Sequence, residues 1–124
     1  ALNIEVLAYS PLALGILCVP PNTQAKPSTF LRQTLFKRLL PQTIELREGL
    51  RSIGKRYDAS QTEVALNWCR AYGAKPIPGI RNPNQASTAS NALKWNLQKS
   101  DLNYLNLLKK KCLVRMPSNP FQSN

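Results

Sequence analysis

The sequence predicts an α/β protein whose strands run parallel. Two short apolar segments of strand length, residues 4–9 and 76–80, are separated by a long stretch with the apolar periodicity of helices. Strands that are apolar throughout are typical of parallel sheets, where helices cover both faces. Because each such strand needs neighbours on both sides, two of them cannot complete a sheet. We therefore expect this chain to be incomplete on its own.

Turn residues and periodicity set the order of the elements. Pro11 ends the first strand, and the prolines around Asn22 predict a long loop after it. Ser60 and Glu63 have the spacing of a capping box, so a helix should begin at Ser60, and Gly73 is suited to end it. The predicted elements are strands over 4–9 and 76–80, a loop over 15–28, helices over 30–40, 41–57, 60–73, 83–93 and 100–112, and an extended tail from residue 116.

The charge of the chain is strongly positive, with 17 Lys and Arg against 6 Asp and Glu. The basic residues are scattered, and their one cluster, residues 109–111, falls where the last helix should end and complements the helix dipole. No aromatic platform for stacking bases accompanies it. A solvated basic face is therefore favoured, which would suit an acidic protein partner, and no specific nucleic acid is predicted.

The cysteines and the most apolar segment further limit the kinds of protein that this sequence can encode. The three cysteines are far apart and the chain has no histidine, so a Cys/His metal site is not predicted. Cys69 is interpreted as a small core residue, in a protein of a reducing compartment. The most apolar segment, residues 6–19, is interrupted by Ser10 and Pro11 and is too short to cross a bilayer, so no transmembrane segment is predicted.

The segment after the second strand has the features of an anion site. Gly79 leaves the backbone open to a ligand, Arg81 offers a bidentate guanidinium, and Asn82 followed by Pro83 predicts a helix start. The positive end of the helix dipole and its free amides would favour a phosphate. The alternative is an ordinary strand–turn–helix connection with a solvated arginine. Phosphates commonly bind the last two loops of (β/α)₈ barrels, which favours a barrel remnant with a phosphate pocket.

Two motifs in this order resemble the last two strands of the aldo/keto reductases. They are residues 8–15, with the sequence AYSPLALG, and residues 76–82, with the sequence PIPGIRN, followed by Gln85. Residues 63–69, EVALNWC, are similar to the family's helix before its eighth strand. The resemblance covers nearly the whole chain, but only the C-terminal part of the family's (β/α)₈ TIM barrel.

A narrower resemblance points to one branch of this family. Ala92, Leu93 and Trp95, with the ending at residues 119–122, are placed as in the plant and cyanobacterial branch that includes pyridoxal reductases. The branch implies a chloroplast location, with the cytoplasm as the alternative. The chain opens at Ala1 almost directly within an apolar segment, so we expect a larger protein, whose N-terminal barrel half, or a partner protein in its place, is missing here.

The resemblance implies one partial aldo/keto reductase domain over residues 1–124. Its parts are the seventh-strand motif at 1–15, a loop and short helix at 16–40, helices at 41–73, the eighth strand and helix at 75–94, and the C-terminal helix and tail at 100–124.

The resemblance also implies NADP(H) as the cofactor and assigns positions to it. These are Tyr9 under the nicotinamide, Ser10, Pro11, Leu12 and Leu14 along the diphosphate and its ribose, Gly79 and Arg81 at the 2′-phosphate, and Gln85 at the adenosine end. The alternatives are structural: barrel filling for Tyr9 and Leu12, a turn hydroxyl for Ser10, and a surface helix residue for Gln85.

The chain departs from the family at points that bear on function. Where the family has Gly-Lys-Tyr, with a lysine on the diphosphate, this chain has residues 19–21, Val-Pro-Pro, and Thr88 and Ala89 replace a Glu-Asn pair. The Asp, Tyr, Lys and His of the family's catalytic tetrad belong to earlier strands, so no catalytic residue is assigned. We therefore expect NADP(H) binding to be weakened or lost, and the chain alone to be inactive.

Two functions follow from these observations. The first is the cofactor-binding, C-terminal portion of an NADP(H)-dependent oxidoreductase that reduces carbonyl substrates. The alternative is a non-catalytic, truncated relative that serves as a basic binding or structural subunit. The intact strand-end motifs favour the first, whereas the lost lysine and Glu-Asn pair favour the second. The carbonyl substrate is not encoded here, because the family's pocket loops come from earlier strands.

Overall fold

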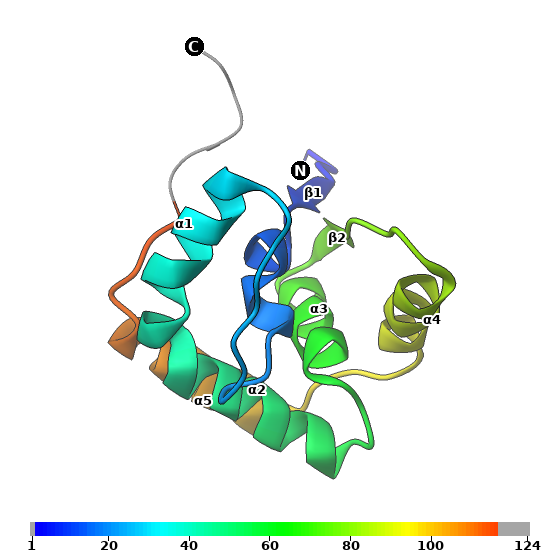
Figure 1. The fold of residues 1–124 in the computed structure, drawn as a ribbon. Helices are drawn as coiled ribbons and strands as arrows, with labels where there is room; N and C mark the ends of the chain where they lie inside the picture. Colours follow the sequence, from blue (N-terminus) through cyan, green and yellow to red (C-terminus); the bar gives the residue numbers. More distant parts are fainter. Residues whose placement is uncertain (1, 117–124) are drawn as a thin grey trace.

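The computed structural model describes residues 2–116, so the resemblance at residues 119–122 and the predicted tail beyond Met116 lie outside them. The elements are β1 (Val6–Tyr9), η1 (Ala13–Cys18), α1 (Phe30–Leu39), η2 (Pro41–Thr43), α2 (Ile44–Arg56), α3 (Gln61–Ala71), β2 (Ala74–Ile77), α4 (Pro83–Asn91), η3 (Ala92–Lys94) and α5 (Lys99–Lys111), where η denotes a 3₁₀ helix. Figure 1 shows the strands at one end of the molecule and α2 with α5 at the other.

The two strands pair in parallel, as the sequence predicts, with Tyr9 opposite Ile77. The connection between them consists of helices, which is what a parallel pair requires. Because both strands run the same way, their carboxyl ends lie at one edge of the sheet. The segments that begin at Ser10 and Pro78 therefore leave the sheet side by side, and this register decides which distant residues meet.

Both strands are shorter than predicted, and the second is shifted toward the N-terminus. β1 begins at Val6, and β2 occupies Ala74–Ile77 instead of residues 76–80. Ser10 has a φ of 50°, so the chain leaves the extended conformation directly after β1. No strand of the described chain then continues opposite the residues beyond Ile77, and they are not held as a strand.

The prediction that these strands are buried is wrong. The side chains of Val6, Leu7 and Ile77 are 57%, 59% and 52% exposed. In the described part of the chain the sheet has two strands, so each has a neighbour on one side alone. The apolar sequence of the strands is therefore left facing solvent.

The buried apolar surface lies between the helices, in two clusters. One joins α2, α3 and α5 through Leu46, Leu50, Ile53, Val64, Ala65, Leu105 and Leu108, and the other joins η1 and α1 through Ile16, Val19, Leu35, Phe36 and Leu39. Each fully buried Leu or Ile contributes about 1.5–3 kcal/mol. Gly49 allows α2 and α5 to approach, since a Cβ there would lie 2.2 Å from Leu108 Cδ1.

The predicted helix boundaries agree with the structure more closely than the strands do. Ser60 and Glu63 form both hydrogen bonds of the capping box at the start of α3. Gly73 follows that helix with a φ of 76°. The predicted loop over residues 15–28 is wrong at its start, because η1 continues to Cys18. Cys69 is half-buried at the end of α3, so it belongs to the edge of the core.

The guanidinium of Arg47 on α2 is buried, with 1% of the residue exposed. It donates from Nη1 to the carbonyl oxygens of Val19 at 3.1 Å and Pro20 at 2.9 Å, and from Nη2 to that of Leu40 at 2.7 Å. Burial lowers the pKa of Arg47 from its ordinary value, yet a guanidinium remains charged at neutral pH. One cation thus fixes the loop after η1 and the end of α1.

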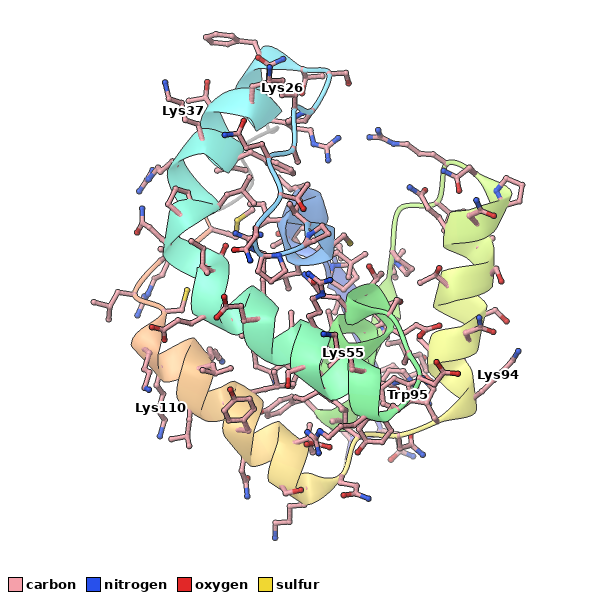
Figure 2. All side chains as sticks on the ribbon, turned by 60° about the horizontal axis from the view of Figure 1, so that its bottom comes forward. Lys26, Lys37, Lys55, Lys94, Trp95 and Lys110 are labelled. Carbon is pink, nitrogen blue, oxygen red and sulfur yellow. The ribbon has the colours of Figure 1, made fainter. Side chains whose placement is uncertain are left out.

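The lysines are spread over the surface. Figure 2 shows the labelled lysines on separate elements: Lys26 and Lys37 at one end, Lys55 on α2, Lys94 beyond α4 and Lys110 on α5. The charges of these lysines are therefore solvated and are spread over several elements instead of forming one basic face.

We expect the purified chain to self-associate through its exposed strands, since unpaired edges pair readily with other chains. Leu7→Lys should shift the sedimentation coefficient toward that of the monomer, because a charge on β1 opposes pairing. Leu107→Lys is the matched control, since Leu107 is 58% exposed on α5, away from the sheet. A wild-type chain that stays monomeric and unfolds in one cooperative transition would contradict this expectation.

Arg47→Met should lower the free energy of unfolding by about 3 kcal/mol, because it removes the charge-assisted hydrogen bonds to three backbone carbonyl groups and to Thr43 Oγ1. Urea unfolding followed by helical circular dichroism measures the change. Arg51→Met is the control, because Arg51 is an exposed arginine on the same helix. Equal effects of the two substitutions would show that the Arg47 hydrogen bonds contribute little.

Candidate functional site

A cleft of about 870 Å³ lies at the carboxyl ends of β1 and β2. Figure 1 shows α1 and α4 on opposite sides of η1 and α3, and all four contribute to its walls. Clefts in this size range hold small molecules and cofactors. Ligands of α/β proteins bind at the carboxyl edge of the strands, which is where this cleft opens.

Seven of the eight positions assigned to the cofactor line this cleft. Ser10, Pro11, Leu12 and Leu14 come from the turn after β1, and Gly79, Arg81 and Gln85 come from the turn and helix after β2. Their segments are distant in the sequence and meet because the strands pair in parallel.

Tyr9 is the one assigned position that does not line the cleft. It is the last residue of β1 and is 72% exposed. Its ring belongs to the open sheet and not to the turn that follows. A ligand in the cleft would have to extend over the end of the sheet to reach it.

The charge of the cleft is positive. Arg32 on α1 and Arg81 after β2 are the charged residues among the described residues that line it, and none of the lining residues is Asp or Glu. Such a lining favours an anionic ligand.

The start of α4 is more fully hydrogen-bonded than the sequence suggested. The side chain of Asn82 accepts from the backbone N–H of Gln85 at 2.9 Å, and Gln85 Oε1 accepts from that of Arg81 at 2.7 Å. The expectation of free amides here is wrong for these two groups, because polar side chains cap them first. The Arg81 guanidinium is left as the charged group that this turn presents to the cleft.

Gly79 keeps part of the cleft open. No atom lies within 4 Å of the place where a Cβ would stand, and the residue lines the cleft. A side chain would therefore occupy space that a ligand could fill. The close approach of ligand and backbone at this position stays a prediction.

Sequence reasoning missed Arg32, Cys18 and Thr62 as residues of the cleft. They lie in a helix or at the end of η1, without a strand-end motif to mark them. Burial raises the pKa of the Cys18 thiol above its ordinary value, and a hydrogen bond with the Thr62 side chain partly offsets the increase. Only the packing of α1 and α3 against η1 brings these side chains to the cleft.

The positions that depart from the family pattern fall in two different environments. Thr88 and Ala89, which replace the Glu-Asn pair, line the cleft with two small side chains. Val19 is buried and its carbonyl group is bonded to Arg47, whereas Pro20, the middle residue of the segment that lacks the lysine, is exposed.

We looked for clusters of metal ligands and for membrane-spanning helices in residues 2–116. No group of three or more His, Cys, Asp or Glu residues among them could hold a metal ion. None of the helices described is both long and apolar enough to cross a membrane.

The chain matches the model of the aldo/keto reductase family over residues 1–110. It belongs to this family. The chain is 34% identical to a protein named pyridoxal reductase, chloroplastic, from Arabidopsis thaliana, over 98% of this chain and 33% of that protein. It is 30% identical to an aldo-keto reductase of Gibberella moniliformis, over 68% of this chain and 28% of that protein.

Family membership points to an oxidoreductase. The chain spans about a third or less of the length of the curated relatives that it matches. Helices and two parallel strands are consistent with part of an aldo/keto reductase fold.

Alkylation of Cys18 by iodoacetamide should be slower than that of Cys112 at pH 8 and should accelerate as the pH rises. A raised pKa means less thiolate, the reactive form, at a given pH. NADP⁺ in the cleft should slow Cys18 further and leave Cys112 unchanged, because Cys112 does not line the cleft. Peptide mass spectrometry measures both rates. If NADP⁺ slowed the alkylation of both thiols equally, or of neither, the result would contradict binding of NADP⁺ in this cleft.

Proposed function

We propose that this chain is the cofactor-binding, C-terminal portion of an NADP(H)-dependent aldo/keto reductase. The observation that carries the proposal is the convergence of two strand-end segments on one cleft lined by arginines and no acidic residue. Each segment alone is an ordinary turn after a strand. Together they offer a polar turn, an open glycine and a guanidinium to one ligand.

The residues present fit a phosphorylated dinucleotide. The cleft has room for one, Gly79 leaves space against the backbone, and Arg81 supplies a charge-assisted contact for a phosphate. When bound, NADPH would supply the hydride for reduction of a carbonyl group. The turn from Ser10 to Leu14 would hold the diphosphate side, and Gln85 Nε2 would face the adenosine end.

We further propose that β1 and β2 are the last two strands of a (β/α)₈ barrel. The exposed apolar side chains of Val6, Leu7 and Ile77 are the surface that neighbouring strands would cover. The lengths of the relatives support this arrangement, since most of each relative has no counterpart here. The partner of this sheet would be the N-terminal part of such a barrel.

The substrate would be an aldehyde or ketone, with pyridoxal as the first compound to test. That choice rests on the name of the Arabidopsis relative, which also supports a chloroplast location. The proton donor for the carbonyl oxygen would come from outside this chain. The 124 residues alone should therefore give no turnover of pyridoxal with NADPH.

The second candidate is a non-catalytic subunit that has lost the cofactor. Thr88 and Ala89 favour it, because small residues stand in the cleft where the family places Glu and Asn. Binding of NADP⁺ to the wild-type protein decides between the two.

Arg81→Ala should weaken NADP⁺ binding about ten- to a hundred-fold, the loss of a charge-assisted hydrogen-bonded contact of about 1.5–3 kcal/mol. NAD⁺ binding should scarcely change, because NAD⁺ lacks the 2′-phosphate. Calorimetric titration of both cofactors into both proteins measures this preference.

Lys94→Ala is the control for a change in net charge, since Lys94 lies beyond the far end of α4 (Figure 2). Equal losses for NADP⁺ and NAD⁺ would place Arg81 in a structural role.

A further inference from the structure

The end of α5 and the segment that follows it form a small surface of high positive charge, away from the cleft. Lys109, Lys110 and Lys111 occupy the last turn of α5, and they are the one run of three basic residues in the sequence. Arg115 follows four residues later, and all four side chains are exposed. We call residues 109–116 the C-terminal basic segment. Figure 2 shows Lys110 in this last turn.

The chain after α5 is held in an extended conformation against the body of the protein. Cys112 ends the helix with a ψ of 96°, and its Sγ donates to the carbonyl oxygen of Gln42 at 3.6 Å. Val114 packs against the apolar cluster of η1 and α1, and Figure 1 shows this part of the chain, in orange, beside α1. Successive side chains of an extended chain point to opposite sides, and Leu113 and Arg115 are accordingly the exposed ones.

Leu113 distinguishes this surface from an ordinary basic helix end. Its side chain is 91% exposed, although its neighbours on both sides in the sequence are half-buried. A leucine that is so exposed contributes almost nothing to the core. It projects on the same side as Arg115, so an apolar group and a cation leave this segment together.

The charges of the C-terminal basic segment are not neutralised within the described chain. The ion pairs of residues 2–116 are Arg56 with Asp101 and Lys75 with Glu5, and neither involves this segment. Residues 102–116 contain no Asp or Glu. Glu45 on α2 lines the same hollow as Lys111 without forming an ion pair with it. The surface therefore keeps a net positive charge.

We propose that the C-terminal basic segment binds reversibly to the surface of an anionic lipid membrane. The three lysines and Arg115 would contact the headgroups, and Leu113 would enter the acyl region. Each basic residue near an anionic bilayer raises the affinity roughly fivefold. A lipid surface also adapts to a projecting side chain such as Leu113, whereas an acidic protein would need a matching pocket for it. This proposal is independent of the proposed function.

A purely local role for the lysines predicts a different outcome. Cations in the last turn of a helix interact favourably with the helix dipole, which would explain Lys109, Lys110 and Lys111 without any partner. In that case their removal would lower the stability of the protein slightly and would affect no membrane binding. The dipole also gives no reason for the exposure of Leu113.

The test is sedimentation of the protein in its full natural length with vesicles of equal parts phosphatidylcholine and phosphatidylglycerol, and with vesicles of phosphatidylcholine alone. The wild-type protein should bind the anionic vesicles and leave the neutral ones, and added salt should weaken the binding. The combined change of Lys109, Lys110 and Lys111 to Gln should weaken binding about a hundredfold, from three charges at roughly fivefold each.

Two matched controls separate this surface from net charge and from apolar exposure in general. Changing Lys26, Lys55 and Lys94 to Gln removes the same charge from other elements (Figure 2) and should leave most of the affinity. Leu113→Gln should weaken binding several-fold, whereas Leu93→Gln, at a leucine that is 64% exposed on η3, should not. Circular dichroism checks that each variant is folded.

Each remaining outcome overturns the proposal. Equal binding of neutral and anionic vesicles, or equal losses for the two lysine triples, would show that this surface is not the binding site. Unchanged binding of the Leu113→Gln variant would remove the insertion of Leu113. Binding to polyglutamate that depends on Lys109, Lys110 and Lys111, without binding to vesicles, would replace the membrane with an acidic protein partner.

Discussion

The arrangement around the cleft depends on the hydrogen bonds that the buried guanidinium of Arg47 donates to the backbone. Its acceptors are the carbonyl groups of Val19, Pro20 and Leu40, which lie in irregular segments or at a helix end. Hydrogen bonds from a charged donor are stronger than those between neutral groups, so they stabilise the position of these segments next to Arg47. η1 and α1 are thereby fixed relative to α2, and both contribute walls to the cleft.

Side chains also donate hydrogen bonds to backbone carbonyl groups at other irregular segments. Gln61 on α3 donates to the carbonyl oxygens of Leu17 and Val19 at 2.6 and 3.0 Å, and Arg70 donates to that of Ala92 at 2.8 Å. Part of the large positive charge is therefore used within the fold to bind backbone. Arginine suits this task because its donors are fixed in a planar fork, whereas the lysines remain in solvent.

The helices and the sheet differ in how much of their apolar surface is buried within this chain. The cluster between α2, α3 and α5 is closed, and beside it Tyr57 stacks on Trp95 at 4.6 Å and donates to Asp101 Oδ2 at 2.6 Å. The sheet exposes most of its apolar side chains. The helical layer thus buries its apolar core within this chain, whereas the two strands beside it leave most of their apolar side chains exposed. This asymmetry is what a part of a larger sheet would show, and it leaves the carboxyl edge, with the cleft, intact.

The sequence by itself determined the local features. The capping box at Ser60, the stop at Gly73 and the helix start at Asn82 are decided by a few adjacent residues, and all three appear in the structure. The parallel pairing and the two strand-end motifs were also readable, because they follow from apolar runs and short sequence patterns.

Only the tertiary structure decided which side chains share the cleft. The entry of Arg32, the exclusion of Tyr9 and the use of Arg47 inside the fold depend on how helices distant in sequence pack. In the sequence, each arginine is one of 17 basic residues. Burial and hydrogen-bond partners distinguish them, and these are properties of the folded chain, since a guanidinium binds whichever carbonyl or phosphate the packing brings within its reach.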